Sequence, residues 1–159
     1  MHVGERCSRE FGSLPGMHKR ILVGLDGSSR QDGVLREALA IASAQGAKLE
    51  LCRAMAIPVS LPTVLWTLQG DDFEAFLVEH GQRELQTLAE KLPAALQRDI
   101  HCRVGQPADV LCDLATELEA DLVIIGTHGY DRIDRVLGTT AAKVVNRAPC
   151  SVMVVREPQ

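Results

Sequence analysis

Two patterns of apolar residues alternate along this chain of 159 residues. Short runs rich in leucine, isoleucine and valine, such as KRILVGL at residues 19–25, are typical of buried or half-buried strands. Between these runs, apolar residues recur every three or four positions, which is the period of an amphipathic helix. Strands are predicted at residues 19–25, 47–54, 99–104, 122–125 and 151–155, and helices at residues 31–45, from 71 or 72 to 92, 108–120 and 139–148.

Glycine, proline and acidic residues mark the expected ends of these helices. Gly46 stands where the first helix should stop, because glycine readily takes the left-handed conformation found at helix C-termini. Asp71 or Asp72 can cap the second helix, and Pro93 ends it. The second helix carries one apolar stripe that is predicted to face the core, formed by Phe73, Phe76, Leu77, Leu85, Leu88 and Leu92.

The alternation of strands and helices predicts a doubly wound α/β fold with a parallel sheet, because parallel strands need helical crossovers. In such sheets, ligands bind beyond the carboxyl ends of the strands, where the strand order reverses. The loops richest in polar residues and glycine are residues 26–29 and 126–140. If the strands before them are neighbours, both loops face one crevice.

Composition and charge narrow the class of protein. With 46% hydrophobic residues the chain can fill one core, so we expect a flexible tail at residues 1–17 and a single domain at residues 18–157. A net charge of −4 and only 3% aromatic residues argue against a nucleic-acid partner. The apolar runs are far shorter than the ~20 residues that cross a bilayer, and residues 1–16 lack the apolar region of a secretory signal, so no membrane partner is expected.

The five cysteines contain no C-x-x-C pair, and we expect them to be reduced thiols in a cytoplasmic protein. Only Cys102 has a histidine, His101, beside it. This spacing favours a buried strand cysteine next to an exposed histidine over a metal site, which would need more ligands close by. No metal ligands are therefore predicted.

The segment GTHGYDRIDRVLGTT contains the chemistry that is easiest to interpret. It places Gly126, Gly129 and Gly138 in a loop that follows a buried strand and ends at a helix start. Glycine allows backbone amides to approach an anion, and Thr139 and Thr140 add hydroxyl groups and the free amides of the first helical turn. The loop is a candidate phosphate site. The alternative is that Thr139 only caps its own helix and the glycines serve tight turns.

Better-known nucleotide motifs and a catalytic base are not indicated. A P-loop has a lysine directly after its last glycine, but Lys143 lies five residues beyond Gly138, and no G-x-G-x-x-G follows a strand. His128 lies between two glycines, and only Asp131 and Asp134 are near it in sequence as orienting partners. We therefore assign no catalytic residue.

Over residues 19–155 the chain resembles the universal stress protein family. Four blocks carry the resemblance in order: ILVGLDGSS, VGQPADVLCDLA, DLVIIGTHG and LGTTAAKVVNRAPCSVMVV. The resemblance implies a five-stranded parallel sheet of Rossmann-like type, similar to the adenine nucleotide alpha hydrolases, with strand order 3-2-1-4-5. This order would make the first and fourth strands neighbours.

The resemblance also implies a nucleotide site. Family members that bind nucleotides have G-x-x-G, nine residues, and then glycine followed by serine or threonine, whereas this chain has eight residues, 130–137, in between. The implied ligand is ATP, AMP or ADP, with Mg²⁺ on the phosphates. By resemblance, phosphate and ribose contacts fall on Gly126, Gly129, Gly138, Thr139 and Thr140, and adenosine contacts on the Asp26 side chain and the Ala54 backbone. Asp26 could instead be an ordinary helix cap.

We therefore expect a cytoplasmic stress-response module that binds ATP without turning it over at enzymatic rates. The resemblance implies a homodimer through the last strand, Ser151–Val155, whose apolar edge is suited to pairing. One alternative is a weak ATPase or phosphotransferase, for which Arg132 and Arg135 are the only cations in the loop. Another is a dimerising stress protein without nucleotide.

Overall fold

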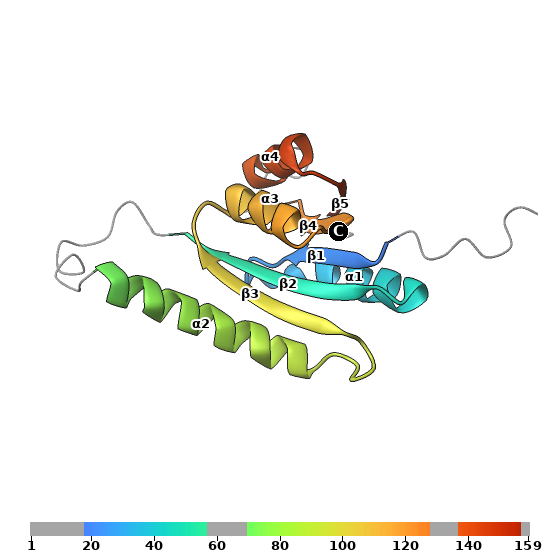
Figure 1. Cartoon of the computed structure of the whole chain (residues 1–159), viewed down its shortest axis with the longest axis horizontal. Helices are drawn as coiled ribbons and strands as arrows, with labels where there is room; N and C mark the ends of the chain where they lie inside the picture. The colour runs from blue at the N-terminus through green and yellow to red at the C-terminus, as the bar shows by residue number, and fades with distance from the viewer. Residues whose placement is uncertain (1–17, 57–69, 128–136, 157–159) are drawn as a thin grey trace, which may run out of the picture.

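The computed structural model of the chain describes residues 18–56, 70–127 and 137–156, and side chains of the second helix from residue 73 onward. Each predicted strand and helix is present (Figure 1). The strands are β1 (Arg20–Gly24), β2 (Lys48–Met55), β3 (Arg98–Val104), β4 (Leu122–Gly126) and β5 (Ser151–Val155). The helices are α1 (Gln31–Gln45), α2 (Gly70–Glu90), α3 (Pro107–Glu117) and α4 (Thr139–Arg147).

The five strands form one parallel sheet in the order β3-β2-β1-β4-β5, which confirms the predicted topology. β1 lies between β2 and β4, so the chain leaves the centre of the sheet in both directions. Gly24 pairs with Cys52 of β2, and Val23 pairs with Ile124 of β4. The adjacency of the first and fourth strands is therefore a property of the fold.

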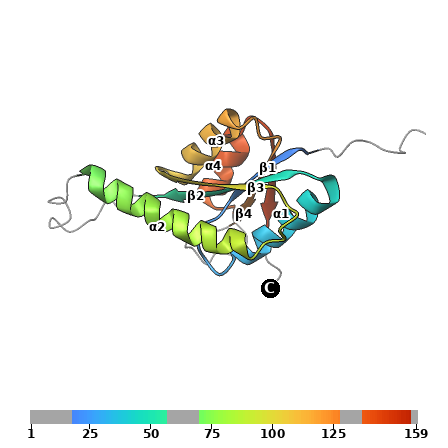
Figure 2. The ribbon, with the colours of Figure 1, turned by 60° about the horizontal axis from the view of Figure 1, so that its bottom comes forward.

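Helices cover both faces of the sheet, as Figures 1 and 2 show. α1 and α2 lie on one face, and α3 and α4 lie on the other. Successive residues of a strand point to opposite faces, so Ile21 and Val23 enter the core under α1 and α2, while Leu22 enters the core under α3 and α4. All three side chains are fully buried.

The apolar stripe of α2 is buried over only part of its length. Leu85 and Leu92 are buried, as the pattern predicts, but Phe76 is 60% exposed and stacks on His80 with ring centroids 6.3 Å apart. The prediction that Phe76 belongs to the core is therefore wrong. The N-terminal part of α2 extends past the sheet, where no strand lies beneath it (Figure 1).

The helix ends differ from the sequence prediction most clearly in two places. α2 begins at Gly70, so Asp71 and Asp72 lie inside its first turn instead of capping it. α3 ends at Glu117, three residues before the predicted position, because Glu119 takes a left-handed conformation with φ of 51°. Gly46 ends α1 as predicted, with φ of 66°.

Several expectations concern segments outside the described ranges. The predicted tail, residues 1–17, and most of the connection between β2 and α2 are among them. The domain limits 18–157 remain a prediction. Among the described residues, no helix combines the length and apolar character needed to cross a membrane.

Candidate functional site

The carboxyl ends of β1 and β4 bring the two predicted loops to one edge of the sheet. A Cβ on Gly24 would lie 2.9 Å from Cγ2 of Ile125, so the glycine permits close packing of these neighbouring strands. One residue later, the Leu25 amide donates to the Cys52 carbonyl at 2.9 Å. Gly126 ends β4 at the same edge. This edge is where α/β sheets bind ligands.

Two backbone hydrogen bonds hold the two ends of the glycine loop together, at Thr127 and Gly138. We call this point the neck of the loop. The Thr127 amide donates to the Val155 carbonyl at 3.1 Å, which continues the pairing of β4 with β5. The Gly138 amide then donates to the Thr127 carbonyl at 3.0 Å. Gly126 and Gly138 are thereby brought together. Gly129 and most of the shortened segment between the two glycines lie outside the described ranges.

α4 begins directly after this neck. Gly138 is the N-cap residue, and among the described residues no side chain caps the helix. Thr139 is the first helical residue and is exposed, so the alternative in which it caps its own helix is wrong. The first helical bond runs from the Ala142 amide to the Gly138 carbonyl at 2.9 Å. The uncapped amides of the first turn, together with the helix dipole, favour an anion here.

The loop after β1 holds Asp26 by a local turn. The Ser28 amide donates to Oδ1 of Asp26 at 2.9 Å, and the Gly27 amide donates to Oε1 of Gln31 at 3.2 Å. α1 begins only at Gln31, with Arg30 as its N-cap residue, so the alternative in which Asp26 caps the helix is wrong. The exposed carboxylate of Asp26 is held at the edge where the strands end.

Arg53 is a residue that sequence reasoning missed. It precedes Ala54, the predicted backbone contact at the end of β2, and its side chain points to the opposite face of the sheet. Its Nη1 lies 2.6 Å from Oε2 of Glu84 in α2. Its guanidinium also lies against Gly27. The alternation of β2 could have placed Arg53 on the side of α2, but nothing in the sequence indicates the contact with Gly27.

The described cysteines and His101 provide no nucleophile at this edge. Burial raises the pKa of the Cys52 thiol to about 12, so the thiolate is not available near neutral pH. Cys102 is buried, as predicted. His101 was predicted to be exposed, but its Nε2 lies 2.8 Å from Oε2 of Glu50, a carboxylate that the strand buries. His128 lies outside the described ranges.

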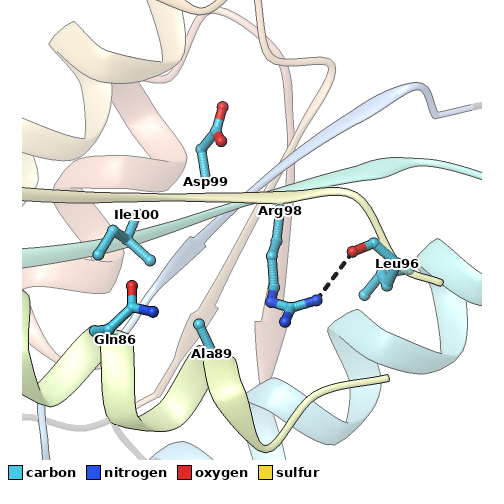
Figure 3. A pocket seen from close by; sticks show the side chains of 6 residues that line it. All are labelled: Gln86, Ala89, Leu96, Arg98, Asp99 and Ile100. Carbon is cyan, nitrogen blue, oxygen red and sulfur yellow. Dashed lines mark hydrogen bonds between the residues drawn. The ribbon is translucent and has the colours of Figure 1, made fainter. Parts of the chain in front are cut away.

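A surface hollow between α2 and β3 lies at the other end of the sheet (Figure 3). Its lining residues are Gln86, Ala89, Leu96, Arg98, Asp99 and Ile100. The Arg98 guanidinium donates to the carbonyls of Pro93 and Leu96 at 3.2 and 3.1 Å, so it is engaged with its own loop. β3 begins at Arg98, which places the hollow near the amino end of that strand. It is not part of the candidate nucleotide site.

Comparison with known proteins agrees with this architecture. The sequence profile of the universal stress protein family matches residues 17–156. The chain belongs to the universal stress protein family. Universal stress protein A homolog 2 of Coxiella burnetii (strain RSA 493 / Nine Mile phase I) is 29% identical over 140 residues, covering 87% of this chain and 95% of that protein.

Solved structures of universal stress proteins share the fold. UspA from Lactobacillus plantarum has a TM-score of 0.69 and 27% identity, covering 87% of this universal stress protein and 97% of the other chain. A universal stress protein in complex with cAMP has a TM-score of 0.59 and 30% identity, again covering 87% and 97%.

Proposed function

We propose that this universal stress protein is an adenine-nucleotide-binding module and that its ligand is ATP. The observation that carries the proposal is the closed neck of the glycine loop, where the Gly138 amide meets the Thr127 carbonyl at 3.0 Å and the uncapped α4 follows. A polyanion is the ligand that such a helix N-terminus favours. A similar universal stress protein that was crystallised with cAMP supports an adenine nucleotide.

The proposed contacts divide between the two loops. The phosphates and ribose would lie against the glycine loop and the start of α4, and the adenosine half would lie against the carboxyl ends of β1 and β2. Gly126, Gly129, Gly138, Thr139 and Thr140 form the first group, and Asp26 with the backbone of Ala54 forms the second. The eight-residue segment of this chain leaves the neck bond intact, which supports retention of the site.

Magnesium would reach the site through the nucleotide. Among the described residues, no group of three His, Cys, Asp or Glu side chains could hold a metal ion. Mg²⁺ commonly binds through substrate phosphates and water with few protein ligands. The proposed Mg²⁺ is therefore a counter-ion of ATP, and no residue is assigned to it.

We further propose a cytoplasmic homodimer that pairs through β5. β5 lies at one edge of the sheet and is apolar, with Val152, Met153 and Val154 half-buried. Such an edge offers free backbone groups for pairing with a second copy. The cysteines within the described ranges are free thiols, which supports a reducing compartment. The net charge of −4 makes nucleic acid an unsuitable partner.

The direct test is to release and identify any small molecule bound to the purified protein, and to titrate the emptied protein with ATP, ADP, AMP and cAMP by calorimetry. Replacing both Thr139 and Thr140 with valine should weaken ATP binding by about tenfold, because hydroxyl contacts to phosphate are lost. Thr116→Val is the matched control, since the Thr116 hydroxyl donates to the Cys112 carbonyl within α3, away from the candidate site. Absence of binding by every nucleotide would refute the proposal.

A further inference from the structure

A single arginine links helix α2 to the loop that holds Asp26. The Arg53 side chain is 18% exposed, and its Nη1 lies 2.6 Å from Oε2 of Glu84. Glu84 belongs to α2, whereas Arg53 belongs to β2 and contacts the loop after β1. The ion pair therefore fixes the guanidinium at the point where three elements meet.

Gly27 accommodates this guanidinium because it has no side chain. Its φ is +77°, a left-handed conformation that side chains rarely adopt. A Cβ at this position would lie 2.0 Å from Nη2 of Arg53 and 2.6 Å from its Cζ. The space that a side chain would fill is thus already occupied by Arg53, and the arginine packs directly on the backbone of the turn.

The same turn orients Asp26. Oδ1 of Asp26 accepts the Ser28 amide at 2.9 Å, across Gly27. An ionised carboxylate has more acceptor sites than this one bond uses, and sugar hydroxyls are donors that match them. Because this bond spans Gly27, the path of Gly27 sets the position of the Ser28 amide that holds the carboxylate.

We propose that Arg53 is a positioning residue for the nucleotide site: held by Glu84, it packs on Gly27 and orients Asp26 toward the ribose hydroxyls of the ligand. This inference rests on the proposed function and adds to it a residue that touches no phosphate. Arg53 therefore contributes to recognition of the nucleoside, whereas the start of α4 recognises the phosphates.

The test is a double-mutant cycle with probes that separate the two halves of the ligand. Calorimetry is performed with ATP, adenosine and inorganic tripolyphosphate on Arg53→Met, Asp26→Ala and the double variant. Each single variant should weaken ATP and adenosine binding by about fivefold and leave tripolyphosphate unchanged. The double variant should bind ATP and adenosine as tightly as the single variant with the lower affinity, because both changes remove the same contact.

The matched control is Arg83→Met, which removes another arginine from an ion pair of α2, the exposed pair with Glu79. This control should bind ATP and adenosine like the unaltered protein. Additive losses in the double variant, or adenosine affinity in Arg53→Met within a factor of about 1.5 of the unaltered protein, would overturn the inference.

Hydrogen exchange of the Ser28 amide provides a measurement that needs no ligand. Arg53→Met should speed this exchange by about fivefold, since the turn loses its support, while Arg83→Met should not. If the unaltered protein binds no nucleotide, the proposed function fails, and the exchange rate still decides whether Arg53 positions Asp26. An unchanged rate in Arg53→Met would reject the positioning role.

Discussion

The amino ends and the carboxyl ends of the strands are held by different kinds of contact. At the amino ends, charged side chains bridge distant segments: Oδ2 of Asp121 accepts the amides of Lys19 and Arg20 at 2.7 and 3.3 Å, and Lys48 pairs with Asp99. At the carboxyl ends, backbone hydrogen bonds such as that from Gly138 to Thr127 hold the glycine loop, and the pair of Arg53 with Glu84 adds a charged contact beside the loop after β1.

On the proposed function, we expect the amino ends to serve stability and the carboxyl ends to serve binding. Glu50 shows it best, because its carboxylate is only 1% exposed and lies 2.8 Å from His101 and 3.1 Å from Lys48. Such buried charges are costly to disturb once they are paired. At the carboxyl ends, no side chain of the described residues caps the amides of α4, a feature that adds little to folding and suits a ligand. Substitutions at the amino ends should therefore reduce stability more than ATP binding, and substitutions at the carboxyl ends should do the reverse.

The largest expected effect is at the amino ends. Glu50→Ala should lower the free energy of unfolding by about 3 kcal/mol, because Arg20, Lys48 and His101 lose the buried carboxylate that they contact. Urea denaturation measures this loss, and Glu79→Ala, which breaks an exposed pair with Arg83, should change little. The stabilisation that ATP adds to Glu50→Ala should equal that of the unaltered protein. A smaller ATP effect would show that the two ends are coupled.

The second prediction concerns the neck of the glycine loop. ATP at about one hundred times its dissociation constant should stabilise the unaltered protein by about 2.7 kcal/mol. Gly138→Val should abolish most of this gain, because a branched side chain would crowd the start of α4. Gly138 has φ of −57° and ψ of 153°, which valine tolerates, so without ATP the loss should be about 1 kcal/mol or less. Thermal unfolding with and without ATP measures both quantities.

Gly129→Val changes a second glycine of the same motif, and we expect it to abolish the stabilisation by ATP as well. If Gly138→Val keeps the full stabilisation by ATP, the start of α4 does not bind the phosphates. The proposed assignment of ligand binding to the carboxyl ends of the strands would then be wrong.

The smallest expected effect is a pH dependence at the amino ends. The hydrogen bond from Lys48 lowers the pKa of the Asp99 carboxyl, so the folded state releases this proton more readily than the unfolded state. The stabilisation is therefore present above the ordinary pKa of about 3.9 and is lost as the pH falls through the lowered value. Because solvent screens this pair, its size should be about 0.5 kcal/mol.

Comparison of the unaltered protein with Asp99→Asn by urea denaturation between pH 3 and pH 6.5 measures this effect. The difference between the two proteins should shrink toward pH 3 and should also shrink when salt is added at pH 6.5. A difference that stays constant over this pH range would show that the pair with Lys48 does not stabilise the fold.

Local pattern was enough to predict the elements but not their surroundings. The apolar pattern located each strand of the sheet because central strands are buried between the helix layers and edge strands alternate between covered and open faces. Phe76 was assigned wrongly because the period of a helix reports a face, not whether another element lies against that face. Asp26 and Thr139 were offered as possible caps because both are capping types near a helix start, whereas the true N-cap residues are Arg30 and Gly138.

The sequence by itself determined the parallel sheet, the glycine loop and its position before a helix, because hydrophobic period and glycine spacing are local properties of the chain. Tertiary structure decided the contacts between residues that are far apart in sequence. Arg53 on Gly27, His101 on Glu50, and Asp121 at the start of β1 each depend on how strands and helices are placed in space. Their energies come from burial and geometry that no local pattern contains.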